Sequence, residues 1–373
     1  MSEKYSYDKI CKVYDSKIAR STFNSFIDKK IFPDPKVDIE SKIKTRYWEI
    51  DQLPALGKIV GFLKNEKGEP FLKNKKTATI ITSYTRKGGV LKSTLAYNVA
   101  RTAALNGYNT LIIGLDSQCD ITNMMGYYED LNNAKTTREA EEILKNKKGL
   151  YNLIDPDESQ RSKLSSLIQK TDLPTLFFIP ETDEIEELIE KIESASYREE
   201  WLKRNVIDKI KDKFDLIVLD SSPTSGRLVS NAMIVSDMIL SPLECSTNNF
   251  KNYARTRLKI TKKLEELGAK DILIKHIPTK LTNTSISQDI YKVYQQISAC
   301  SIKAIKVSAQ MEASTFRGIS ILEHEPTGDA ANTMREIVKE VFQDLEAAQV
   351  SKSNTSPILH AQKLNSAIQQ VQL

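Results

Sequence analysis

Short apolar runs and helical patterns alternate along most of this chain. The apolar runs predict buried β-strands, and the segments between them carry apolar residues at the i, i+3 and i+4 spacing of amphipathic helices. Strands that alternate with helices imply an α/β fold, with a mostly parallel sheet flanked by helices. The predicted strands are 80–83, 110–115, 175–179, 214–219, 238–241 and 272–277, and the predicted helices include 183–192, 201–211 and 252–267.

The first 65 residues follow a different pattern and predict a small, mainly helical domain. Short helices are expected over residues 7–14 and 21–30, and the segment 50–56 is expected to lead into a third helix through Ile59, Val60 and Leu63. The basic segment 42–48 lies between the second and third helices, and we interpret it as a wing. This order suits a winged helix-turn-helix, whose second helix enters the major groove by its N-terminal end.

If the N-terminal part is a winged helix-turn-helix, its sequence indicates which residues would contact DNA. The order of elements resembles MerR-like domains, in which an Arg–Tyr/Trp pair precedes an Asp-x-Leu helix, as at 46–48 and 51–53 here. Ser21 is a favourable N-cap residue for the second helix. A helical appendage that serves dimerisation is the alternative. The candidate DNA-binding residues are Arg20, Ser21, Thr22, Asn24, Lys44 and Arg46.

The segment 80–94 carries the strongest chemical signal in the chain. An apolar strand ends in a loop with a glycine pair, and a lysine, two hydroxyl residues and a helical pattern follow. Loop N–H groups and the first turn of a helix bind phosphate, Lys92 supplies a positive charge, and the Ser93 hydroxyl can ligate Mg²⁺. The sequence therefore predicts an ATP and Mg²⁺ site of the P-loop type.

The motif Lys-Gly-Gly-Val-x-Lys-Ser-Thr at 87–94 resembles the deviant Walker A box of the ParA/MinD superfamily of ATPases. The resemblance implies that Lys87 reaches across a dimer interface to the partner's nucleotide. Leu91 departs from the usual glycine before the second lysine. The nucleotide-binding residues implied are Lys87, Gly88, Gly89, Val90, Leu91, Lys92, Ser93 and Thr94.

Two later strands end in aspartate, at the edge where open α/β sheets bind ligands. Asp116 follows the strand over 110–115, where relatives read Asp-x-Asp-Pro-Gln, and the resemblance implies that it positions or activates the attacking water. Gly114 stands where relatives have the first aspartate. Asp220 ends the strand over 214–219 and resembles the Walker B aspartate, which implies a role in holding Mg²⁺ together with Ser93. Lys87, Lys92 and Asp116 are thus the candidate catalytic residues.

Two C-terminal segments, 311–318 and 325–331, resemble the last motifs of ParA proteins. The resemblance implies that Pro326 packs on the adenine. It also implies that basic residues near the first segment bind DNA without reading its sequence, although Ala309 stands where an arginine is usual. The candidates for that role are Lys303, Lys306 and Arg317.

Charge and cysteine content narrow the possible partners. The net charge of +5 lies within residues 1–75, which hold 16 Lys and Arg against 11 Asp and Glu, while the remainder carries 38 of each. The positive charge of the N-terminal part has two equally supported interpretations: a surface that binds a polyanion, or an ordinary solvated surface. Four widely spaced cysteines indicate reduced thiols. No apolar run spans a bilayer, and the polar tail 349–373 lacks the cationic face of a membrane anchor, so we expect no membrane partner.

The domains are expected at 1–65 (winged helix-turn-helix), 66–76 (linker), 77–348 (ATPase) and 349–373 (polar tail). The resemblance to the larger ParA proteins implies a cytoplasmic, nucleoid-associated bacterial partition ATPase. It implies a homodimer that sandwiches ATP, binds non-specific DNA and an operator, and is stimulated by a ParB-like partner. A nucleotide-sensing repressor with little hydrolysis, or a ParA/MinD-like ATPase that positions another cargo, is the alternative.

Overall fold

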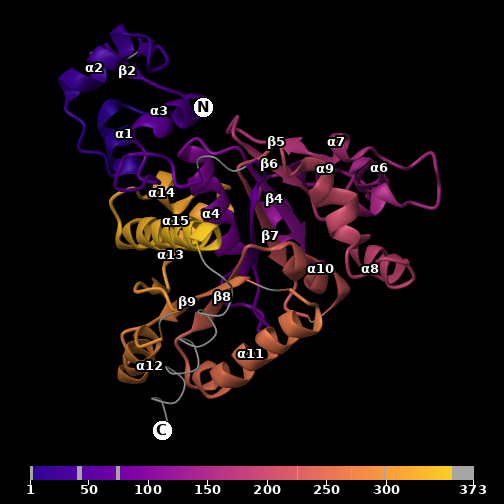
Figure 1. Cartoon of the computed structure of the whole chain (residues 1–373). Coiled ribbons are helices and arrows are strands. Elements are labelled where there is room, and N and C mark those ends of the chain that lie inside the picture. The colour runs from indigo at the N-terminus through magenta and orange to yellow at the C-terminus, as the bar shows by residue number, and fades with distance from the viewer. Residues whose placement is uncertain are drawn as a thin grey trace.

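The computed structural model describes residues 3–39, 44–72, 76–224, 226–269, 271–297 and 299–354. Its main sheet has the strand order β10-β9-β8-β3-β7-β4-β6-β5 (Figure 1). All neighbouring pairs are parallel except β5–β6. This confirms the predicted fold class. The strands are β3 (Thr79–Ser83), β4 (Thr110–Leu115), β5 (Gln169–Lys170), β6 (Leu176–Ile179), β7 (Leu216–Ser221), β8 (Met238–Glu244), β9 (Leu273–Leu281) and β10 (Ile305–Lys306).

Helices cover both faces of the sheet, because neighbouring strand residues point to opposite sides. Ile81 and Ile112 share a core with α4 and α15, whereas Ile80 and Leu111 share another with α8 and α10. The predicted helix 201–211 is interrupted by a π-helical turn at Lys203–Ile207. The helices are α4 (Lys92–Leu105), α5 (Asp120–Met124), α6 (Thr137–Asn146), α7 (Leu164–Leu167), α8 (Ile185–Glu193), α9 (Asp208–Ile210), α10 (Arg227–Val235), α11 (Thr247–Glu266), α12 (Ser285–Gln295), α13 (Ala309–Phe316), α14 (Ile321–His324) and α15 (Asp329–Asn354).

The N-terminal part contains three short helices and a two-stranded antiparallel hairpin. The elements are α1 (Tyr7–Tyr14), α2 (Arg20–Asp28), β1 (Lys36–Asp38), β2 (Thr45–Tyr47) and α3 (Leu53–Val60). The predicted N-cap at Ser21 is wrong, because Ala19 caps α2 and Ser21 lies inside its first turn. The third helix ends at Val60, three residues earlier than predicted. The assignment of these elements to a DNA-binding domain stays a prediction.

The N-terminal helices pack on the end of α4 that is remote from the loop after β3 (Figure 1). The Tyr14 hydroxyl lies 2.7 Å from the carbonyl oxygen of Leu53 in α3 and 3.0 Å from that of Leu105, the last residue of α4. One continuous apolar core therefore joins these helices to α4 and α15.

The segment 66–76, expected as a linker from its charged and Gly/Pro-containing sequence, also contributes to this core. Phe71 and Leu72 are buried, and the Phe71 ring lies 6.3 Å from the Phe342 ring of α15. Of the predicted polar tail, residues 349–354 continue α15 and 355–373 lie outside the described residues. Within the described ranges, no helix has the length and apolar character needed to cross a bilayer.

Candidate nucleotide and metal site

The loop 84–91 connects the carboxyl end of β3, a central strand, to the first residue of α4. Gly89 and Leu91 both have left-handed backbone angles, with φ of +67° and +68°. Glycine adopts this conformation freely, whereas an L side chain pays roughly 1–2 kcal/mol for it. Leu91 packs its side chain against the main core, which offsets part of that cost. Leu91 therefore holds the left-handed conformation that glycine adopts freely, at the position where the deviant Walker A box usually has glycine.

The two lysines of the loop occupy different environments. Lys92 is buried, and its Nζ lies 3.8 Å from the Asp116 carboxylate at the end of β4. Lys87 is half-exposed at the rim and forms an ion pair with Glu244, the last residue of β8. Sequence patterns do not single out Glu244, because β3 and β8 become neighbours only in the folded sheet. One lysine thus lies inside the site and the other faces outward.

Asp220, near the end of β7, is fully buried, and neither carboxylate oxygen has a hydrogen-bond partner among the described residues. Burial raises the pKa of Asp220 to about 7, against the opposing effects of the nearby Ser93 hydroxyl and Lys92 ammonium. The Ser93 hydroxyl lies 3.1 Å from the Asp120 carboxylate at the start of α5. A buried carboxylate without a partner, beside a hydroxyl and a second carboxylate, offers the oxygen ligands that Mg²⁺ prefers.

Asp220→Asn is expected to stabilise the nucleotide-free protein at neutral pH. Since the folded pKa of Asp220 is about 7, above its ordinary value of 3.8, the folded state binds the proton more tightly than the unfolded state does. Stability from this group is therefore lost as pH rises from about 4 to about 7. In urea denaturation, the free energy of unfolding of the variant minus that of the wild type should increase over this pH range and stay constant above it. An advantage that does not change with pH would contradict the assignment.

A second buried carboxyl, that of Glu181, lies beside Asp116. Glu181 follows β6, which pairs with β4, and its Oε1 accepts from the Asp116 N–H at 3.4 Å. Its Oε2 accepts from the N–H and the hydroxyl of Thr122, at 3.2 and 3.1 Å. Burial, followed by the charge of Asp220, raises the pKa of Glu181 to about 8. Glu181 therefore ties both ends of the segment 116–122 to the edge of the sheet.

The space next to Gly114 is filled by this same carboxyl. A Cβ at position 114 would lie 2.1 Å from the Glu181 carboxyl carbon. The side chain of Glu181 thus occupies the place of any side chain at position 114, where relatives have their first aspartate. Glu181 comes two residues after the apolar strand 176–179. An acidic residue close behind an apolar strand also marks Asp116 and Asp220, so this pattern makes Glu181 a candidate but does not predict its contact with Asp116.

The remaining nucleotide-site prediction concerns Pro326, which the structure does not bring to the loop 84–91. Its carbonyl accepts from the Arg335 guanidinium at 2.5 Å, and the same guanidinium donates to the carbonyl of Lys12 in α1. The neighbouring Tyr14 contacts Leu105, the residue of α4 farthest from the loop. The adenine role of Pro326 stays a prediction without a supporting contact.

Most of the predicted DNA-binding cations already have acidic or histidine neighbours. Lys303 pairs with Glu336 at 2.8 Å, Lys306 with Asp329 at 3.5 Å, and Arg317 lies 3.4 Å from His324 Nδ1. In the N-terminal part, Arg20 pairs with Asp8 and stacks on Tyr7. Exposed members of the predicted set in the N-terminal part are Arg20, Ser21, Thr22 and Asn24 on α2, and Lys44 and Arg46 at the hairpin. Lys306 and Arg317 are exposed as well, and Lys303 is partly buried.

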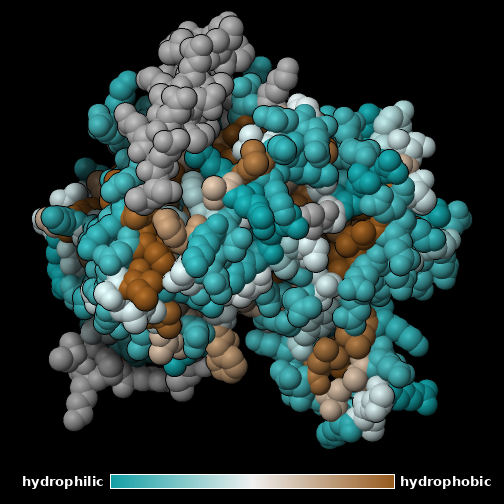
Figure 2. Space-filling view, turned by 90° about the horizontal axis from the view of Figure 1, so that it is seen from below, coloured by the Kyte–Doolittle hydropathy of each residue, from teal (hydrophilic) through white to brown (hydrophobic). Residues whose placement is uncertain are grey.

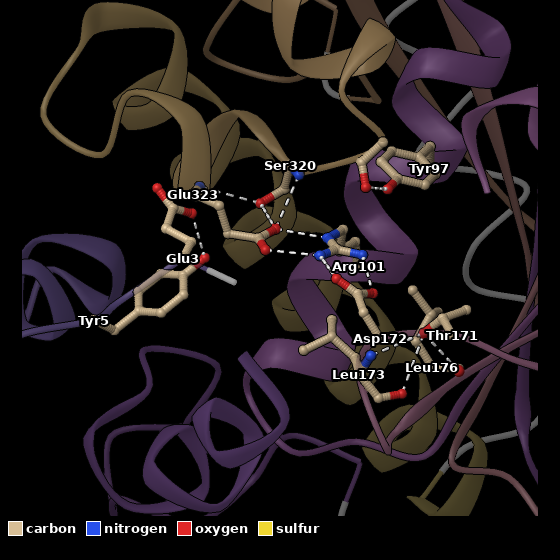
Figure 3. A network of polar contacts seen from close by, with 11 residues as sticks. Glu3, Tyr5, Tyr97, Arg101, Thr171, Asp172, Leu173, Leu176, Ser320 and Glu323 are labelled. Carbon is tan, nitrogen blue, oxygen red and sulfur yellow. Dashed lines mark hydrogen bonds and ion pairs between the residues drawn. The ribbon is translucent and has the colours of Figure 1, made fainter. Parts of the chain in front are cut away.

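A buried ion-pair network anchors α4, whose first turn carries Lys92 and Ser93. The Arg101 guanidinium lies between the carboxylates of Glu323 in α14 and Asp172 (Figure 3). Its Nε and Nη2 donate to Glu323, and its Nη1 and Nη2 donate to Asp172, all at 2.7–2.8 Å. The Glu323 carboxylate also accepts from the N–H and hydroxyl of Ser320. This network fixes α4 against α14 and the segment between β5 and β6.

Known proteins resemble this chain over the part that contains the loop 84–91 and the strands around it. A family model described as an AAA domain matches residues 78–272, which is more than half of the chain. The chromosome-partitioning ATPase Soj of Treponema pallidum is 26% identical over 160 residues, which cover 43% of this chain and 54% of Soj. The chain spans about half the length of several such curated relatives.

Solved structures share the fold at low sequence identity. The complex of Cyanothece McdA(D38A) with ATP aligns with a TM-score of 0.58 and 19% identity, covering 72% of this chain and 98% of McdA. A structure described as a partition protein aligns with a TM-score of 0.61 and 16% identity, and covers 94% of both chains. The chain belongs to the AAA-domain family matched here, and it is similar to chromosome-partitioning and partition proteins.

Proposed function

We propose that this protein is a DNA-partition ATPase that binds ATP and Mg²⁺ at the loop 84–94. The observation that carries the proposal is the placement of two lysines in one loop: Lys92 buried beside Asp116, and Lys87 half-exposed at the rim. A P-loop with a single catalytic lysine needs only the buried one. An exposed second lysine can reach phosphates that belong to another molecule.

The residues around Asp220 suit a magnesium ion. Asp220 and Ser93 would hold it, directly or through water, and the nucleotide phosphates would complete its ligands. Within the described ranges, no three His, Cys, Asp or Glu side chains form a metal-binding group, and the nucleotide phosphates would supply the remaining ligands. When bound, Mg²⁺ neutralises the charge that develops on the transferred phosphoryl group.

The protein's own residues would then perform defined tasks. Lys92 binds the β- and γ-phosphates after exchanging its contact with Asp116 for them. Asp116, freed from Lys92, orients the attacking water, while Glu181 holds the backbone of Asp116 in place. Lys92 and Asp116 are buried, at 7% and 4% exposed, which strengthens their electrostatic contacts.

Two ATP-bound chains would form a symmetric dimer in which each Lys87 leaves Glu244 for the opposite phosphates. This dimer would bind DNA non-specifically, and a ParB-like partner would stimulate hydrolysis and release it. The N-terminal helices would bind an operator and repress the protein's own genes. The protein would act on the nucleoid in a bacterial cytoplasm. The names of two curated relatives, a chromosome-partitioning ATPase and a chromosome partitioning protein, and of two solved partition proteins support the partition role.

The proposal is tested by fluorescence anisotropy with random duplex DNA and with the fragment upstream of the gene. Wild-type protein should bind random DNA only with ATP, and Lys92→Ala should lose nucleotide binding altogether. Lys87→Ala should still bind ATP but lose DNA binding, whereas the exposed Lys145→Ala serves as a matched control and should behave as wild type. Binding to the upstream fragment alone, unchanged by Lys87→Ala, would instead support a nucleotide-sensing repressor.

A further inference from the structure

Helix α11 carries an unusual concentration of positive charge. Between Thr247 and Leu264 the sequence contains six Lys and Arg residues and no Asp or Glu, and the two exposed glutamates Glu265 and Glu266 end the helix. Of these six, the exposed ones are Lys251, Arg255, Lys259 and Lys262, while Arg257 and Lys263 are partly buried. These four residues are called the α11 stripe below.

The four cations of the α11 stripe lie on one side of the helix. Successive residues turn by 100°, so the stripe spans an arc of only about 80°, on the side opposite Ile260 and Leu264, which bury the helix against its neighbours. Its length from Lys251 to Lys262 is about 17 Å at 1.5 Å per residue. Because each DNA strand carries one phosphate per 3.4 Å of axis, this matches roughly five base pairs.

The charges of the α11 stripe are not neutralised within the described part of the chain, since none of the four cations forms an ion pair there. The cations predicted from sequence differ in this respect: Lys303 and Lys306 each have a carboxylate within 4 Å. A cation already paired with a carboxylate gains less from a phosphate than an unpaired one. The structure therefore favours α11 over those positions as an anion-binding surface.

The position of α11 connects it to the proposed nucleotide site. The helix follows β8, whose last residue, Glu244, pairs with Lys87 (Figure 1). The underside of the molecule, where α11 lies, is largely hydrophilic with separate apolar patches (Figure 2). Leu258 is the one large apolar residue of α11 that is strongly exposed, at 55%. A membrane-binding helix needs a continuous apolar face, so a phosphate polymer in water fits this surface better.

We propose that the α11 stripe is the surface by which this protein binds the phosphate backbone of duplex DNA without reading its sequence. This inference rests on the proposed function, and it names where the non-specific DNA lies. Contacts from four cations, three of them lysines, to phosphates provide affinity and register rather than base discrimination. A symmetric dimer carries two such stripes, so binding becomes bivalent when ATP joins two chains.

The test compares two quadruple variants with equal loss of charge. One replaces the α11 stripe with alanine; the other replaces four exposed lysines elsewhere, Lys145, Lys163, Lys170 and Lys209. ATP-bound protein is titrated into labelled random duplex at several salt concentrations, and ATP turnover is measured in parallel as a check on folding and on the nucleotide site. The α11 variant should bind about 10²- to 10³-fold more weakly near 0.15 M salt, with the slope of log K against log salt reduced by about 3–4.

The outcomes separate the inference from the proposed function. If the DNA affinity of the α11 variant stays within about threefold of the wild-type affinity and its salt slope is unchanged, the α11 inference is overturned. The proposed partition function is then unaffected. An equal loss in both quadruple variants also overturns the α11 inference, because net charge would then be responsible. No ATP-dependent DNA binding by wild-type protein overturns both. Pelleting of wild-type protein with anionic vesicles, but not with DNA, would assign the stripe to a membrane.

Discussion

Gly114→Asp is expected to destabilise the protein severely, and the paired exchange Gly114→Asp/Glu181→Ala is expected to restore it. A Cβ at position 114 would lie 2.1 Å from the Glu181 carboxyl carbon, so the glutamate would have to move. Glu181 is 1% exposed and accepts hydrogen bonds from Thr122 and Asp116, so moving it breaks those contacts. Overpacking of this kind costs about 1–3 kcal/mol, and a second buried carboxyl adds to that cost.

Urea denaturation and ATP turnover of the single and paired variants measure this effect. Gly114→Ala isolates the steric part and should cost about 2–3 kcal/mol. Glu181→Gln keeps the size of the side chain and, since burial raises the pKa of Glu181 to about 8, changes little charge at neutral pH. It should cost less than Gly114→Asp, the remaining cost coming from the amide nitrogen, which cannot accept the hydrogen bond from Asp116 or from Thr122. If Gly114→Ala is as stable as wild type, or if the paired exchange is no better than Gly114→Asp alone, Glu181 does not fill the place of a side chain at position 114.

Arg101→Met is expected to cost about 3–5 kcal/mol, because it leaves the Glu323 carboxylate buried without its cation. The Arg101 and Glu323 side chains are 1% and 0% exposed, and Arg101 Nε and Nη2 donate to the Glu323 carboxylate at 2.7 and 2.8 Å. The paired variant Arg101→Met/Glu323→Gln removes both charges and keeps an acceptor for Ser320. It should therefore recover much of the lost stability.

Chemical denaturation provides the measurement, with Arg138→Met as the control. Arg138 pairs with Glu142 on the surface of α6, where the two side chains are 88% and 63% exposed. Such exposed pairs contribute less than about 1 kcal/mol, so the control should change little. Equal small losses for Arg101→Met and Arg138→Met would show that the buried network does not anchor α4.

The parts of the fold that the sequence predicts are those encoded by local patterns. The strand over 110–115 agrees with β4 residue for residue, because an unbroken apolar run is bounded by Asn109 and Asp116. Asp116 and Asp220 lie beside Lys92 and Ser93 as the order of motifs implies. Parallel strands bring their carboxyl ends to one edge, so the position of these aspartates follows from topology alone.

The parts that the sequence does not predict depend on contacts between distant segments. Glu181 and Glu244 join the site because β6 lies beside β4 and β8 beside β3, and no local pattern encodes that pairing. Likewise, the charged residues of 66–76 suggest an exposed linker, yet Phe71 and Leu72 are buried against α15 and its neighbours. The sequence shows the cations of the α11 stripe, but only the structure shows that they lack ion pairs among its described residues while Lys303 and Lys306 have them.

The most direct test of the account measures nucleotide binding and mass together, by titration calorimetry and light scattering with Mg²⁺ and a non-hydrolysable ATP analogue. Wild-type protein should bind one nucleotide per chain, and its molecular mass in light scattering should rise to that of a dimer. Lys87→Ala should bind the nucleotide with similar affinity and fail to dimerise, and Lys92→Ala should not bind it. Dimerisation by Lys87→Ala equal to that of wild type, or nucleotide binding by Lys92→Ala, would contradict the assignment of the two lysines.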